Sequence, residues 1–326
     1  MNATSLISGL KKYYQGVSVI AKKEKINPCT MMIDCIWSWI RYGCVLNQYL
    51  DGKFYCRKDF ERRRILTYRK WKKIIKNYND PLYTHYLENK IHFNQFFDNL
   101  IGREWLQSTK MTKDEFINFV TRHRKIICKP SSDWEGNGIF VLNVIESEQE
   151  AIFEKLKEKD LIIEEYVKQH NKMMFGGHSV NTIRVYTVYD KKTEKAYVFK
   201  TSLRVGVGNS IVDNSHSGGQ AYEVDIETGY VVSPSWSHNS PDLLIHPGTD
   251  IFMLGQLIPY WEEVKNLCCK AANKINQVRY IGWDVAIKED GPILIEGNHD
   301  PDLDLVEFVG QYGYYKQIMK IGRAHV

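Results

Sequence analysis

The sequence predicts an α+β protein with a mainly helical amino-terminal region. Apolar residues recur at helical spacing in the first part of the chain. From Arg124 onward, short β-rich runs alternate with loops and helices up to about residue 298. This order of patterns is typical of an α+β arrangement built mainly from antiparallel hairpins.

Composition narrows the function classes. The chain has 326 residues, and its 43% hydrophobic and 25% charged residues are ordinary for a globular protein. A net charge of +5 is mild and gives no sign of a nucleic-acid partner. No run of eighteen apolar residues predicts a membrane-spanning helix, and the start of the chain is a poor secretory signal. Seven scattered cysteines without a CxxC pair are typical of reduced thiols, so we expect a cytoplasmic protein.

Helical patterns fill the first 80 residues. Residues 34–49 carry apolar side chains at helical spacing, namely Ile36, Trp37, Ile40, Val45 and Leu46. The basic stretch from Lys53 to Lys76 then predicts an amphipathic helix whose Arg and Lys stems cover apolar surface. The alternative is a dock for an anionic partner, such as a membrane face or an acidic glycan.

A break at Asn79-Asp80-Pro81 separates this region from the rest. Residues 83–106 are predicted to be helical, and Thr112 to Glu115 form a capping box that opens a further helix. A helix is also expected from about residue 250 to 275. The β-rich runs lie at residues 125–130, 138–144, 161–167, 182–190, 196–206, 221–226, 280–288 and 292–298.

A lysine and a glycine-containing loop predict a phosphate site. Lys129 ends one expected strand, and Gly136 and Gly138 precede the next. Glycines let backbone N–H groups approach phosphate oxygens, and a lysine supplies a point charge. The loop has no GK[ST] of a Walker motif, and a strand follows where a dinucleotide fingerprint needs a helix. A plain hairpin with a glycine turn is the alternative.

The run at residues 161–167 is a candidate hinge for a nucleotide. An apolar strand ends in Glu164 and Glu165, followed by Tyr166 and Val167. An adenine needs a flat apolar slot with backbone groups at its edge, and a ribose needs a carboxylate or an amide. A core strand with an acidic end is the simpler interpretation.

Two strand-borne arginines are candidates for binding an anion. By alternation, Arg184 shares a face with Thr182 and Tyr186. An arginine on a central strand is costly unless it meets a carboxylate or a phosphate, and Arg204 is a residue of the same kind. The loop at residues 212–219, which contains Asn214, is either an anion-binding nest or a simple turn.

The strongest pattern predicts a metal site. Glu296 and Asn298 are two residues apart and so share one face of a strand, and the preceding strand delivers Asp284 to the same face. Two carboxylates and an amide are hard oxygen ligands that suit Mg²⁺ with bound phosphates. The alternative, a hairpin with its acids in solvent, fits poorly with the apolar run Pro-Ile-Leu-Ile before Glu296.

Five motifs follow one another along the chain: the strand lysine, the glycine-containing loop, the Glu-Glu-Tyr-Val hinge, the Asn-Thr-Ile-Arg strand and the Asp…Glu-Gly-Asn ending. In this order they resemble the ATP-grasp superfamily, which includes D-alanine–D-alanine ligase and glutamate ligases, over about residues 85–300. Residues 41–56 with the basic stretch after them, 213–219 and 224–229 extend the likeness to the sugar-transfer-associated ATP-grasp family, found among polysaccharide-biosynthesis genes. The resemblance implies a small ATP-grasp subdomain at 81–167 and a larger one at 168–320, clasping ATP after the helical region 1–80. The last six residues, 321–326, fit nothing before them and are expected to be a non-native tail.

The resemblance also implies roles for single residues. Lys129 would contact the α- and β-phosphates, and the earlier Lys90 would also contact ATP. Mg²⁺ or Mn²⁺ would be held by Asp284, Glu296 and Asn298. The phosphate flap would include Ser131, Ser132, Gly136 and Gly138. The adenine hinge would be formed by Glu164, Glu165, Tyr166 and Val167. The γ-phosphate or acyl-phosphate would be held by Arg184, Arg204 and Asn214. The flap is bulkier than the family pattern, and Gln169 or Asn171 stands where a ribose acid is usual.

Three functions follow as hypotheses. The first is a ligase that joins a carboxylate to an amine or another nucleophile through an acyl-phosphate, acting on a small molecule or glycan precursor in polysaccharide or cell-surface glycan biosynthesis. The second is a kinase acting on a sugar or polyol hydroxyl, with His178, His216 or Asp213 as the base. The third is a nucleotide-binding module without turnover.

Overall fold

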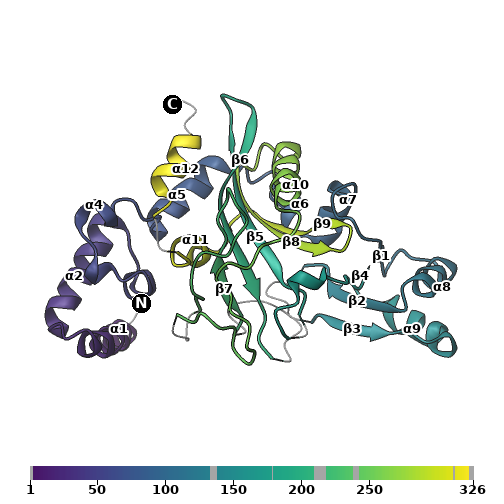
Figure 1. Ribbon diagram of the computed structural model, residues 1–326, viewed down its shortest axis with the longest axis horizontal. Coiled ribbons are helices and arrows are strands. Elements are labelled where there is room, and N and C mark those ends of the chain that lie inside the picture. Colours follow the sequence, from purple (N-terminus) through teal and green to yellow (C-terminus); the bar gives the residue numbers. More distant parts are fainter. Residues whose placement is uncertain are drawn as a thin grey trace.

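The structure is a computed structural model that describes residues 3–132, 138–177, 179–208, 218–237, 242–310 and 313–322. Two antiparallel sheets with flanking helices confirm the predicted α+β class (Figure 1). No helix in these ranges is both long and apolar enough to cross a membrane. Asn214, Gly136, Asp213, His178 and His216 lie outside the described residues.

The smaller sheet has four strands in the order β1-β4-β2-β3. Its core forms where α8 (Lys113–Arg122) and α9 (Gln149–Leu156) bury Phe116, Phe119 and Phe153 against Ile126 and Ile163. The predicted capping box of α8 is confirmed, since Thr112 Oγ1 accepts from Glu115 N at 3.2 Å and Glu115 Oε2 accepts from Thr112 N at 2.7 Å. The strands are β1 (Trp105–Gln107), β2 (Lys125–Pro130), β3 (Phe140–Asn143) and β4 (Leu161–Glu165).

The larger sheet has five strands in the order β7-β6-β5-β8-β9. One face is covered by α10 (Trp261–Lys274), and the other by α5 (Tyr68–Tyr78), α11 (Leu303–Glu307) and α12 (Tyr315–Gly322) (Figure 1). Alternation along β5 sends Ile183 and Val185 to the α10 side and Tyr186 to the other. The strands are β5 (Thr182–Asp190), β6 (Lys195–Val205), β7 (Gln220–Glu223), β8 (Tyr280–Lys288) and β9 (Gly291–Asn298).

The helix expected at residues 83–106 is wrong for much of its length. The structure has α6 (His85–Glu88) and α7 (Lys90–Phe96), and β1 follows. Asn89 separates the two helices because its side chain accepts from the backbone N–H groups of Ile91 and His92, which makes it a helix N-cap. Both helices contact strand β9, which carries Glu296 and Asn298.

The helix expected from residue 250 begins eleven residues later, with α10 at Trp261. Gly248 and Gly255 adopt the left-handed region, with φ of +75° and +80°, and Tyr260 has φ of +55°. A chain with these conformations cannot continue a right-handed helix. The glycines and Pro259 are sequence signals that outweigh the apolar pattern.

The amino-terminal region is built from α1 (Ala3–Lys23), α2 (Pro28–Tyr42), α3 (Leu46–Asp51), a 3₁₀ turn η1 (Phe54–Cys56) and α4 (Asp59–Arg62). The single helix expected over 34–49 is wrong, because Gly43 with φ of +72° ends α2. The single basic helix expected from Lys53 to Lys76 is also wrong. Only its last part forms α5, and this helix packs on the larger sheet.

A buried polar network ties the segment before α5 to the carboxyl-terminal helices. Glu307 Oε1 accepts from Leu66 N at 2.8 Å and from Tyr314 N at 3.0 Å. Beside it, Lys200 Nζ donates to Glu223 Oε1 at 2.8 Å and to Val309 O at 2.7 Å. Burial raises the pKa of Glu307 to about 7, although the two backbone donors favour its charged form.

Candidate active site

Strand register brings the predicted metal ligands together on one face of the larger sheet. Arg184 of β5 pairs with Asp284 of β8, and Asp284 pairs with Glu296 of β9. Gly282 pairs with Asn298, so the Asn298 side chain lies two positions along β9 from Glu296, on the same face. Residues directly opposite each other in antiparallel strands point to the same face. The structure thus groups these side chains as the spacing predicted.

Asp284 is the centre of a buried ion-pair cluster. Arg184 donates to both of its carboxylate oxygens, with Nη2 to Oδ2 at 3.0 Å, and Arg204 Nη1 donates to Oδ2 at 2.8 Å. Burial alone would raise the pKa of Asp284, but the two guanidinium groups outweigh burial and lower the pKa to about 2. Asp284 is therefore an anion at neutral pH, and the arginines meet the carboxylate that their position on the sheet requires.

Glu296 is held in the opposite electrostatic situation. Burial raises its pKa, and so do the negative charge of Asp284 and a hydrogen bond shared with it. Asn298 Nδ2 lies 3.4 Å from Glu296 Oε1. Between them, Gly297 has no room for a side chain, since a Cβ would come within 2.8 Å of the Trp283 ring. Asp284, Glu296 and Asn298 thus lie close together, and the positive charge nearby does not offset the effects that raise the pKa of Glu296.

Lys129 is fixed in place by Glu164. Its Nζ donates to Glu164 Oε2 at 2.6 Å, and Asn94 Nδ2 donates to Oε1 at 2.9 Å. Glu164 is 2% exposed, and its pKa is lowered because Arg103 and Lys129 outweigh the effect of burial. The side chain of Glu164 therefore faces Lys129 and Arg103.

Arg103 is the residue that sequence reasoning missed. Its Nη2 lies 2.7 Å from Glu164 Oε1 and donates to Ile295 O at 3.1 Å, and its Nη1 donates to Leu294 O. Gly102 makes this possible: its φ is +56°, and a Cβ there would lie 2.4 Å from Ile293 Cγ2. Arg103 thus links the strand that carries Glu164 to the residues just before Glu296. An isolated arginine between two elements gives no sequence pattern that predicts this contact.

The described parts of the flap lie next to these groups. Ser131 N donates to Asp160 O at 3.3 Å and its hydroxyl donates to the Asp160 carboxylate, whereas Ser132 is exposed. Lys90 N donates to Ser131 O at 3.0 Å, which places the start of α7 against the flap. Gly138 has φ of +71° and packs on Pro130.

The candidate hinge follows Glu164 at the end of β4. Glu165 faces His123 and Lys288 at 3.5 and 3.6 Å, and the Tyr166 ring lies under Lys125 Nζ at 3.5 Å from its centroid. Val167 is buried with Ala286 and Ile293 of the larger sheet. The hinge therefore joins the two sheets physically.

Comparison with known proteins gives one family and several distant structural likenesses. No curated protein sequence matches the chain. Among solved structures, the ATP-grasp ligase PsnB with a minimal precursor, Mg and ADP is 14% identical, with 82% of this chain and 65% of that chain covered and a TM-score of 0.42. The chain thus spans less than two thirds of that ligase. D-alanyl-alanine synthetase A from Vibrio cholerae is 14% identical over 74% of this chain and 66% of that chain, with a TM-score of 0.46.

D-alanine–D-alanine ligase from Bacillus anthracis in complex with ATP is 13% identical, with 74% of this chain and 67% of that chain covered and a TM-score of 0.45. The family of sugar-transfer associated ATP-grasp proteins matches residues 69–323. This match includes every predicted site residue, from Lys90 to Asn298, and confirms the resemblance seen in the motifs. The chain belongs to the sugar-transfer associated ATP-grasp family.

Proposed function

We propose that this protein is a Mg²⁺- and ATP-dependent ligase that activates a carboxylate as an acyl-phosphate and joins it to an amine or another nucleophile. The carrying observation is the cluster of Asp284, Glu296 and Asn298 beside two buried arginines on one face of the larger sheet. We place the nucleotide between the two sheets, where subdomains 81–167 and 168–320 meet. The substrate would be a small molecule or glycan precursor in a cytoplasmic step of polysaccharide or cell-surface glycan assembly.

The residues present fit a divalent cation. Burial and the negative charge of Asp284 both raise the pKa of Glu296, so a cation would relieve the repulsion where two carboxylates and an amide converge. Hard oxygen ligands of this kind suit Mg²⁺, which commonly takes one or two carboxylates together with substrate phosphates. When bound, the ion would neutralise negative charge on the phosphates.

The arginines supply the rest of the electrostatic stabilisation. Arg184 and Arg204 are fixed by the same carboxylate, so their positive charges are oriented before any substrate arrives. Preorganised charge aimed at a transferring phosphoryl group needs no rearrangement during the reaction. Lys129, held by Glu164, offers a third fixed cation for the phosphates.

A binding module without turnover is harder to reconcile with Glu296. Its raised pKa shows that the charge of this acid is unfavourable in the folded protein without a cation. A protein that only bound the nucleotide base would gain stability from an uncharged residue at this position. The cost of Glu296 therefore supports a role in holding a metal for chemistry.

Trapping with hydroxylamine separates a ligase from a kinase. An acyl-phosphate is a mixed anhydride that hydroxylamine converts to a hydroxamate, whereas a phosphate ester does not react. With Mg·ATP and a panel of carboxylates, we expect hydroxamate to form with ADP, and to fall by about 100-fold or more in Arg184→Ala. A stable phosphorylated sugar or polyol, formed in equal amount with ADP and without hydroxamate from any acid, would assign the kinase function.

Lys129→Ala is expected to remove most of the increase in melting temperature that Mg·ATP produces in the parent protein. A charge-assisted phosphate contact contributes roughly 1.5–3 kcal/mol, so nucleotide affinity should fall by about 10- to 100-fold. Thermal unfolding with and without Mg·ATP measures the effect. Lys155→Ala, at an exposed position on α9, is the matched control and should keep the full shift. An undiminished shift in Lys129→Ala would exclude this lysine from phosphate binding.

A further inference from the structure

Helix α2 has two opposite apolar faces, and only one of them is buried. Toward the amino-terminal core it buries Met31, Cys35, Ser38 and Tyr42. The opposite face carries what we name the outward stripe: Ile33, Ile36, Trp37 and Ile40, which are 69%, 50%, 51% and 53% exposed. These positions follow the i, i+3, i+4, i+7 spacing by which a helix normally faces a core. The apolar pattern that predicted this helix is therefore largely on its solvent side.

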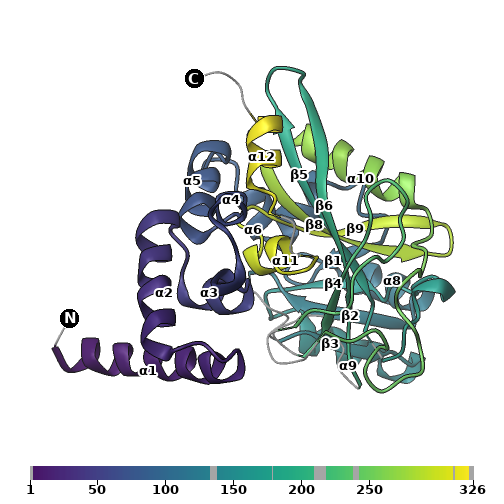
Figure 2. The ribbon, with the colours of Figure 1, turned by 60° about the vertical axis from the view of Figure 1, so that its left-hand side comes forward.

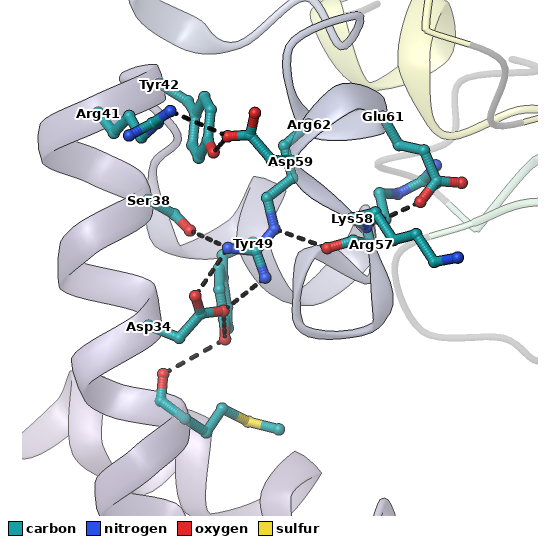
Figure 3. A network of polar contacts seen from close by, with 11 residues as sticks. Asp34, Ser38, Arg41, Tyr42, Tyr49, Arg57, Lys58, Asp59, Glu61 and Arg62 are labelled. Atoms are coloured by element: carbon teal, nitrogen blue, oxygen red, sulfur yellow. Dashed lines mark hydrogen bonds and ion pairs between the residues drawn. The ribbon is translucent and has the colours of Figure 1, made fainter.

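The orientation of α2 is fixed by polar contacts on its inner side (Figure 3). Arg62 forms a two-pronged ion pair with Asp34, at 2.7 and 2.8 Å, and Tyr49 OH donates to the same carboxylate at 2.7 Å. Tyr42, the last residue of the helix, donates its hydroxyl group to Asp59. Rotating α2 to bury the outward stripe would break all of these contacts. The exposure of the stripe is thus built into the region.

Positive charge is concentrated in the same region. Residues 1–78 contain 17 Lys and Arg against 5 Asp and Glu, a net charge of +12. The whole chain carries +5, so residues 79–326 carry −7. Exposed cations lie at both ends of α2: Lys22 and Lys23 precede it, and Arg41 lies in its last turn. Arg69, also exposed, donates to the carbonyls of Trp39 and Ile40 at its carboxyl end.

This combination selects one partner among those that could cover an apolar stripe. A second copy of the chain would bring two regions of net +12 together, which like-charge repulsion opposes. A bilayer surface with anionic lipid accepts Trp and aliphatic side chains at the headgroup boundary and attracts the flanking Lys and Arg. We propose that the outward stripe seats this protein on an anionic membrane surface, with α2 lying in the interface plane.

The placement is compatible with the candidate active site. Figures 1 and 2 show α2 at one end of the molecule and the smaller sheet, with α8 and α9, at the other. Contact through α2 would therefore leave the larger sheet and its neighbours accessible to a substrate. The inference does not depend on the proposed reaction, because it uses none of the site residues.

The test is co-sedimentation of the full chain with vesicles of phosphatidylcholine alone or phosphatidylcholine mixed with phosphatidylglycerol. The parent should bind the anionic vesicles, and the binding should weaken as salt is raised. Ile36→Ser/Trp37→Ser/Ile40→Ser should lower the partition coefficient by about 10-fold or more. The control Leu82→Ser/Ile145→Ser/Leu244→Ser, at positions 76%, 56% and 45% exposed elsewhere, should bind like the parent.

Circular dichroism and melting temperature establish that both triple variants are folded. Quenching by bromine-labelled lipid, present in the parent and reduced in Trp37→Phe, would place this ring in the bilayer. Equal binding by the stripe variant and the parent would overturn the proposal. So would failure of the parent to bind anionic vesicles, or a dimer in sedimentation equilibrium that the stripe variant abolishes, which would assign the face to a second copy.

Discussion

Glu296→Gln is expected to reduce ATP turnover by about 1,000-fold or more without loss of stability. In the proposed function this carboxylate holds a cation against phosphates, but in the protein alone it is penalised by burial and repelled by Asp284. Removing the charge should leave the free energy of unfolding unchanged or increase it. Activity assays together with urea unfolding measure both quantities in one variant.

The pH dependence of stability tests whether the charge of Glu296 destabilises the folded protein. Because the folded-state pKa of Glu296 is raised, its ionisation costs stability, which falls as pH rises from the ordinary carboxyl range through the folded-state pKa. Glu296→Gln should flatten this fall. Added Mg·ATP should stabilise the parent more strongly as pH rises, because cation binding displaces the proton.

Asp284→Ala is the informative contrast. It should also abolish turnover, but it leaves Arg184 and Arg204 buried without their carboxylate and should cost about 3–5 kcal/mol of stability. Equal destabilisation by Glu296→Gln and Asp284→Ala would contradict the electrostatic picture of the site. Normal activity of Glu296→Gln at ordinary Mg²⁺ concentrations would rule out its role as a ligand.

Glu164→Ala is expected to destabilise the protein by about 3–5 kcal/mol, because it leaves the charges of Lys129 and Arg103 buried and unpaired. Its neighbour Glu165 is the matched control. Glu165 makes longer contacts to His123 and Lys288, and Glu165→Ala should cost less than about 1 kcal/mol.

Urea unfolding measures the two free energies, and hydrogen exchange locates the loss. In Glu164→Ala, protection should fall in β2 and β4 and also in β9, since Arg103 connects Glu164 to the carbonyls of Leu294 and Ile295. An effect confined to β4 would show that Arg103 does not couple the two sheets.

Strands were more predictable from the sequence than helices, for a physical reason. Alternation has a period of two, so a run such as 280–288 fixes both the strand and the face of Asp284, and the structure has β8 at those residues. Helical spacing continues across a break when apolar residues on both sides of the break keep the same period. Gly43 and Asn89 ended helices whose periodic pattern ran on beyond them.

The candidate site was predictable where it depends on strand faces, and not where it depends on distant contacts. Alternation required an acid or a phosphate for Arg184, but only the register shows that the acid is Asp284. The Glu164 side chain could not be assigned to Lys129 and Arg103 from one strand alone. Similarly, the period of Ile36, Trp37 and Ile40 predicts a helix but does not say whether a core covers that side.

The hydrogen bonds of Glu307, on α11, cross the boundary at which the family match begins. The family match starts at residue 69, yet Glu307 takes one of its two backbone donors from Leu66, three residues earlier. Tyr315 N likewise donates to Arg64 O at 3.0 Å. A chain shortened to residues 69–323 would keep every candidate site residue. It would lose the Leu66 N–H group that donates to the buried carboxylate of Glu307. The hydrogen-bonded core of the larger sheet's helices therefore reaches back at least to Arg64, five residues before the family match begins.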